Sequence, residues 1–143
     1  MVEETGTAAA IQSIKAHVWS LLEQEGYRGV EADEDGDVRF KAEGRSLVVI
    51  FNDDDPGYLR LALPSFWPID DDAERVNAYR VANNITRDTK CVSVVVTPND
   101  NVWATAEWLT MGPEAIDGAM LVRLTEILLA AASEFRREMQ AAI

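Results

Sequence analysis

The sequence predicts an α+β fold in which helices pack on an antiparallel β-sheet, in the order helix, four strands, helix, two strands, helix. Apolar residues recur at helical spacing near both ends of the chain and once in the middle. Between these segments, apolar residues alternate with polar ones, and short turns separate the runs. Because short turns join antiparallel strands, the strands form hairpins. A chain of 143 residues, 48% of them hydrophobic, suits one globular unit. We therefore expect a single domain over residues 1–143.

The first helix is predicted from Thr7 to Gln24. Thr7 is the expected N-cap and Gly26 the expected stop. Residues 1–7 are acidic and polar, so we expect them to be disordered, and they lack the basic start and apolar stretch of a secretory signal. The apolar stripe consists of Ile11, Ile14, Val18, Leu21 and Leu22.

Four strands are expected between Val30 and Leu63. In residues 37–42 apolar and charged residues alternate, which is typical of a half-buried strand, whereas Ser46 to Phe51 is apolar on both faces and predicts a central strand. Leu59, Leu61 and Leu63 mark the fourth strand. The turns are Asp33-Glu34-Asp35-Gly36, Glu43-Gly44 and Asn52 to Gly57.

The next segment is an exposed link followed by the middle helix. Pro64 and Pro68 bracket the link, which carries Phe66 and Trp67. Asp70-Asp71-Asp72 opens the helix, because acidic residues in a first turn satisfy free N–H groups and the helix dipole. Asp71 and Glu74 resemble a capping box, and we expect the helix to end near Ile85.

A second hairpin and a long helix complete the fold. Its strands are Lys90 to Thr97 and Val102 to Leu109, and Cys91 is expected to be a small buried hydrophobe. The last helix is expected to start at Gly112-Pro113-Glu114, with proline at its first position, and to run about 30 residues, or roughly 45 Å. Part of its wide apolar stripe could face a second subunit. The stripe contains Ile116, Met120, Leu124, Ile127, Leu128, Ala131, Phe135 and Met139.

This order of elements resembles that of the YbjN family. The resemblance rests on a middle helix bearing Asn77, Asn83 and Asn84, on the Cys91–Val96 strand, and on the Val102–Leu109 strand before the final helix. It covers about Ile11 to Phe135. Proteins of that family are described as sensory-transduction regulators, and their fold is like that of type III secretion chaperones. The resemblance implies a dimerising, protein-binding module and supplies no catalytic residues.

Net charge excludes several classes of partner. The chain carries a formal charge of −12, with an isoelectric point near 4.4. Nucleic acids and anionic membrane surfaces attract proteins through Lys and Arg, so we expect neither as a partner. No segment approaches the roughly 18 apolar residues of a membrane span. We expect a cytoplasmic protein.

Candidate metal-binding and catalytic residues all have simpler interpretations. Glu31-x-Asp33-x-Asp35-Gly36 echoes the start of a calcium loop, but Ala42 occupies the twelfth position, where such a loop needs Glu, so a hairpin turn is expected. The runs 53–55 and 70–72 could hold magnesium if they met in space, although turn and helix-cap roles explain both. The sole histidine, His17, is expected on a polar helix surface. We therefore expect no catalytic residue, no metal and no cofactor.

The remaining candidates concern binding. Trp103 shares a strand face with polar residues, so it is expected to point outward, and Trp67, Trp103 and Phe66 are candidate partner-binding residues. For the asparagines, Asn83 or Asn84 is expected to cap the end of the middle helix, while Asn77 and Asn84 are alternative ligand-binding residues. The leading hypothesis is a non-enzymatic, chaperone-like or regulatory protein-interaction module that forms a homodimer and binds a protein partner. The alternative is a small-molecule-binding sensor with a pocket between the middle helix and the sheet.

Overall fold

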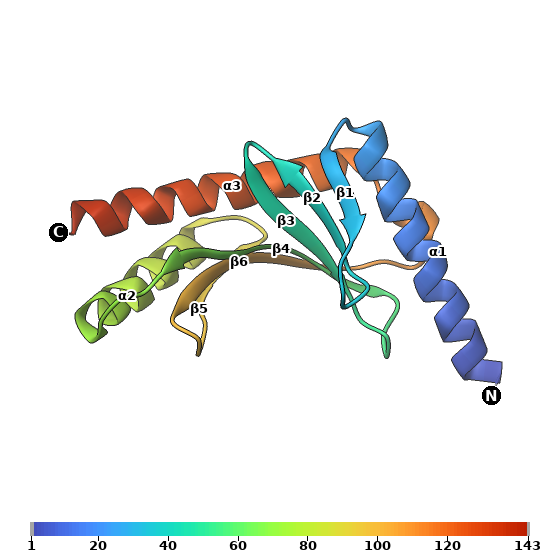
Figure 1. Cartoon of the computed structure of the whole chain (residues 1–143), viewed down its shortest axis with the longest axis horizontal. Helices are drawn as coiled ribbons and strands as arrows, with labels where there is room; N and C mark the ends of the chain where they lie inside the picture. The colour runs from blue at the N-terminus through green and yellow to red at the C-terminus, as the bar shows by residue number, and fades with distance from the viewer. Residues whose placement is uncertain (1, 143) are drawn as a thin grey trace.

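The computed structural model describes residues 2–142 and confirms the α+β class and the predicted order of elements (Figure 1). It contains three α-helices, six strands and one short 3₁₀ helix. In chain order the elements are α1 (Val2–Gln24), β1 (Arg28–Ala32), β2 (Val38–Ala42), β3 (Arg45–Phe51), β4 (Tyr58–Pro68), α2 (Asp72–Asp88), β5 (Val92–Val96), β6 (Asn101–Leu109), η1 (Pro113–Ala115) and α3 (Gly118–Ala141). Within the described residues, no helix combines the length and apolarity that crossing a membrane requires.

All six strands belong to one antiparallel sheet, in the order β1-β2-β3-β4-β6-β5. The predicted meander and the predicted second hairpin are joined where β4 pairs with β6, with Leu59 opposite Trp108 and Leu61 opposite Ala106. The chain leaves β4 through α2, forms β5 at the sheet edge, and returns as β6 beside β4. The second hairpin therefore extends the first sheet.

One face of this sheet carries the core. Residues paired across the strands at its centre are all buried, in the row Val49, Leu61, Ala106 and Val92. They belong to the same hydrophobic cluster as the buried faces of all three helices. Figure 1 shows α3 running along the sheet, with α1 at the β1 end and α2 at the β5 end. The helices therefore cover a single face.

The opposite face has no helical layer among residues 2–142, and we call it the bare face. A central row of residues crosses five strands of this face, and each residue of the row is paired with the next. The rest of the bare face consists of the residues two positions before or after this row on each strand. The central row is Arg39, Val48, Ala62, Thr105 and Ser93. The flanking residues are Lys41, Ser46, Ile50, Arg60, Pro64, Glu107, Trp103 and Val95.

The first helix begins earlier than predicted. α1 starts at Val2, so Thr7 lies inside it and the predicted N-cap is wrong. The helix also occupies residues expected to be disordered, apart from Met1, which lies outside the described residues. The run of alanines after Thr7 has high helix propensity, which suits this segment to a helix.

The exposed link predicted between Pro64 and Pro68 is wrong, because β4 continues through it to Pro68. Ser65 adopts a left-handed conformation with φ of 48°, and the β4–β6 register shifts between Leu63 and Trp67. This irregularity lets the strand carry two prolines and still pair at its end, and it turns Phe66 into the core.

The ends of the other helices also differ from prediction. α2 runs past Ile85 to Asp88 and its C-cap residue is Thr89, so neither Asn83 nor Asn84 caps it. The Asp71 cap is confirmed, because its side chain accepts the Glu74 N–H.

The predicted start of the last helix is wrong, because Pro113 opens the separate turn η1. The chain then becomes extended at Ile116, and α3 begins only after Asp117, which accepts the Ala119 N–H. The apolar stripe of α3 is largely buried, with Met120 and Ile127 partly buried, so the sheet, α1 and α2 cover most of it.

Two single residues differ from expectation. Cys91 is exposed and adopts φ of 63°, because it precedes the first residue of β5, Val92, instead of lying within the strand. His17 is half-buried, and its Nε2 lies 3.1 Å from the carbonyl oxygen of Ile116. The imidazole thus links α1 to the segment before α3.

Candidate functional site

The centre of the bare face is apolar. Val48, Ala62 and Thr105 are only 7%, 0% and 8% exposed although no helix among residues 2–142 covers them, because they are small and their larger neighbours shield them. Trp103 and Ile50 are half-buried beside this row, and Val95 on the edge strand is exposed. The confirmed outward position of Trp103 places its indole on this face.

Charged side chains surround this apolar centre. Arg60 lies opposite Glu107 on β6, and its Nε is 3.8 Å from the Glu107 carboxylate. On the other side, Arg39 Nε is 3.5 Å from Asp33. An apolar centre with a charged rim is the usual anatomy of a protein–protein interface.

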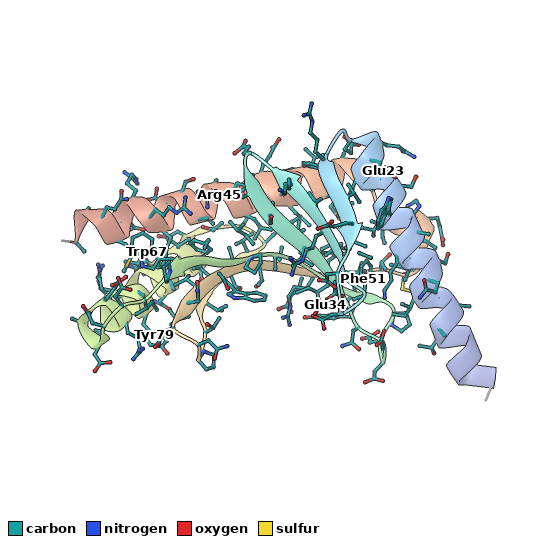
Figure 2. The ribbon with its side chains drawn as sticks, viewed as in Figure 1. Glu23, Glu34, Arg45, Phe51, Trp67 and Tyr79 are labelled. Carbon is teal, nitrogen blue, oxygen red and sulfur yellow. The ribbon has the colours of Figure 1, made fainter. Side chains whose placement is uncertain are left out.

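A hollow of about 360 Å³ lies where the β1–β2 turn meets the bare face, and we call it the acidic hollow. The carboxylates of Asp33, Asp35 and Asp37 line one side of it. Ile50, Pro64 and Trp103 contribute apolar surface to its lining. Glu34 and Phe51 mark this end of the sheet in Figure 2.

Backbone hydrogen bonds explain why the three aspartates lie close together. Asp33 Oδ1 accepts the N–H groups of Asp35 and Asp37 at 3.0 and 2.9 Å, and Asp37 accepts the Phe51 N–H at 3.0 Å. Side-chain oxygens that accept nearby N–H groups stabilise turns. The predicted hairpin turn is therefore confirmed, and carboxylate oxygens of the three residues lie within 4.8 Å of one another.

Asp37 gives this turn a pH dependence. Burial raises the pKa of its carboxyl above the ordinary value, the Phe51 N–H and Lys15 lower it, and the charges of Asp33 and Asp35 raise it. A raised native pKa means that the folded state holds the proton more tightly than the unfolded state does. The resulting contribution to stability is complete below the unfolded pKa and is lost as pH rises through the native pKa.

Asp37→Asn removes this titration while keeping an oxygen that can accept the Phe51 N–H. We expect the free energy of unfolding of the wild type, minus that of the variant, to fall as pH rises from about 3.5 to about 7. Urea unfolding of both proteins across this range measures the difference. A difference that stays constant or rises with pH would contradict the assignment to Asp37.

Trp67 and Asn77 meet in a second hollow, of about 500 Å³, between the end of β4, the start of α2 and the end of α3. The indole N–H of Trp67 donates to Glu74 Oε1 at 2.8 Å, and Asn77 Nδ2 lies 3.5 Å from the sulfur of Met139. Asn84 does not line this hollow. A ligand-binding role for Asn77 and Asn84 stays a prediction.

The other candidates are dispersed. Phe66 is buried against Phe135, so it is not available to a partner, whereas Trp67 packs on the helical side of the sheet and Trp103 lies on the bare face. The two acidic runs lie beyond opposite ends of β4, whose eleven residues span roughly 35 Å. They do not meet, and the shared magnesium site that they could have formed is not assembled.

Sequence reasoning missed most of the bare face. The double-sided apolar pattern of Ser46 to Phe51 predicts a central strand, but it does not indicate that one face of that strand has no helix above it. Nothing local distinguishes Val48, which has no helix above it, from Val49, which faces the helices.

Comparisons with solved structures show the fold of type III secretion chaperones. A protein from Methanothermobacter thermautotrophicus superposes with a TM-score of 0.64 at 12% identity, over 90% of this chain and 97% of its own. The Yersinia pestis type III secretion chaperone SycH, in complex with a fragment of YscM2, superposes with a TM-score of 0.59 at 10% identity, over 85% of this chain and 98% of its own. ExsC in the ExsC–ExsE complex superposes with a TM-score of 0.58 at 13% identity, over 87% of this chain and 95% of its own. No protein-family model and no curated protein matches the sequence.

Proposed function

We propose that this chain is a non-enzymatic, chaperone-like interaction module that binds a protein partner on the bare face. The observation that carries the proposal is a sheet surface that no helix of residues 2–142 covers and that carries the half-buried Trp103 and Ile50 and the exposed Val95. In antiparallel sheets with one solvated face, that face is usually polar. Contiguous exposed apolar surface marks interaction sites in folded proteins.

Two further observations support this proposal. Two of the structures with the same fold contain a bound protein, YscM2 in one and ExsE in the other. In this chain the only histidine contacts a backbone carbonyl, and the acidic runs are separated by the length of β4, which favours a binding role over catalysis. We further propose that the chain belongs to the YbjN family and has a regulatory role.

The proposal includes a homodimer. α2 exposes Val76 and Tyr79 to 71% and 55%, one helical turn apart, and Figure 2 shows Tyr79 on the side of α2 away from α3. These two side chains would form part of the dimer interface, in which each subunit typically buries roughly 800 Å². A particle mass near twice 15.8 kDa in solution supports the dimer, whereas 15.8 kDa excludes it.

Partner capture tests the bare face directly. We expect the tagged wild-type chain to retain one stoichiometric protein from a native lysate and Trp103→Ala to lose it, because truncating an aromatic at an interface centre typically costs about 2 kcal/mol or more. Met111→Ala is the control, since Met111 is 98% exposed beyond the end of β6 and belongs neither to the bare face nor to the proposed dimer surface. Equal capture by wild type and Trp103→Ala would place the partner elsewhere.

A further inference from the structure

We propose that the acidic hollow selects partner segments in which an arginine or lysine adjoins an apolar residue. This inference rests on the proposed function and adds the chemistry of the partner. In the bound state the cation lies beside Asp35 and Asp37, and the apolar neighbour packs on Pro64, Ile50 and Trp103.

The charges of the hollow are unbalanced. Three carboxylates line it together with one guanidinium, that of Arg39, which is 3.5 Å from Asp33 and whose side chain is 56% exposed. Asp35 and Asp37 form no ion pair among the described residues. Lys15 offsets part of this negative charge, since its ammonium group lowers the pKa of Asp37, but three carboxylates still face only two cationic side chains, Arg39 and Lys15. An incoming cation would therefore meet a net negative charge next to apolar surface, where attraction is less screened than in water.

The apolar part of the hollow suits the apolar neighbour of the basic residue. Ile50 and Pro64 offer apolar surface on which this neighbour packs. Trp103 is half-buried, so part of its indole stays accessible to the same neighbour. Recognition thus requires both the basic residue and its apolar neighbour.

Charge complementarity distinguishes this occupant from the alternatives. A two-fold contact between two copies whose axis passes through the hollow would place one acidic hollow against the other, and like charges oppose such a contact. Nucleic acids and anionic lipids would meet the same three carboxylates and an overall charge of −12. A basic-apolar polypeptide segment remains the occupant that the surface favours.

Phage-displayed random dodecapeptides, selected on the full-length wild-type protein, test this inference. We expect the peptides whose binding is lost in Trp103→Ala to be enriched in arginine or lysine next to an apolar residue. A selected peptide with arginine replaced by the neutral isostere citrulline should bind roughly fivefold more weakly in fluorescence anisotropy. This difference should shrink at high salt, because ions screen the attraction.

Asp35→Asn tests the hollow itself, since the exposed Asp35 side chain accepts none of the hydrogen bonds that hold the turn. We expect it to remove most of the arginine-over-citrulline preference. Asp54→Asn, an equal loss of charge from an exposed turn between β3 and β4, should keep the preference. An unchanged preference in Asp35→Asn would overturn the assignment.

The selection also separates this inference from the proposed function. Peptides that depend on Trp103 but show no enrichment in basic residues would overturn the charge selection and leave the bare face as a binding surface. If no selected peptide depends on Trp103, both the inference and the bare-face binding mode fail.

Discussion

Phe135→Ala is expected to lower the free energy of unfolding by about 3–5 kcal/mol, the usual loss when a fully buried phenylalanine is truncated. Phe135 on α3 is 0% exposed. Its ring meets Phe66 edge-on at 5.5 Å between centroids and Trp67 at 5.8 Å. Truncation would leave a cavity where α3 packs on the end of β4, and equilibrium urea unfolding measures the loss.

Met111→Ala is the control for this prediction, because it shortens an apolar side chain that is 98% exposed beyond the end of β6. Its cost should be below about 1 kcal/mol, as for most surface substitutions. A loss below about 1 kcal/mol in Phe135→Ala as well would show that α3 does not pack on β4 in solution. Because Trp67 lies against Phe135, the fluorescence of Phe135→Ala in its native state should also change.

Leu61→Ala and Ile50→Ala together test which face of the sheet is covered. Leu61 on β4 is 0% exposed beneath the helices, so its truncation should cost about 2–5 kcal/mol. Ile50 on β3 is half-buried on the bare face, and its truncation should cost about 1 kcal/mol or less, because it already contacts water. Urea unfolding of both variants measures this difference.

A large loss in Ile50→Ala would mean that a further layer covers the bare face in solution. The dependence of unfolding on protein concentration identifies that layer, since a second copy of the chain stabilises the fold by mass action. A large loss without such dependence would contradict the arrangement of helices on one face only.

The candidate site was only partly accessible to sequence reasoning. The outward position of Trp103 could be predicted because strict alternation places it with Thr105 and Glu107, and the structure confirms it. The burial of Phe66 in the core could not be predicted, because the left-handed conformation of Ser65 breaks the alternation just before it. The acidic hollow was missed because it joins the β1–β2 turn to residues of β4 and β6.

The sequence by itself determined the kind and order of the elements. Helical and strand periodicities are local properties of the chain, and turn residues such as those of Asp33 to Gly36 act within a few positions. Element ends were less accessible, because the limits of α1, β4 and α3 depend on bulges, caps and packing that periodicity does not specify.

Only the tertiary structure decided that β6 pairs with β4, and with it that the three helices of residues 2–142 all lie on one face of the sheet. Strand pairing across a long connection depends on which partner buries the most apolar surface, a comparison over the whole molecule. The alternating patterns of β4 and β6 do not specify which strands they pair with. The bare face, and the acidic hollow at its edge, are consequences of that pairing.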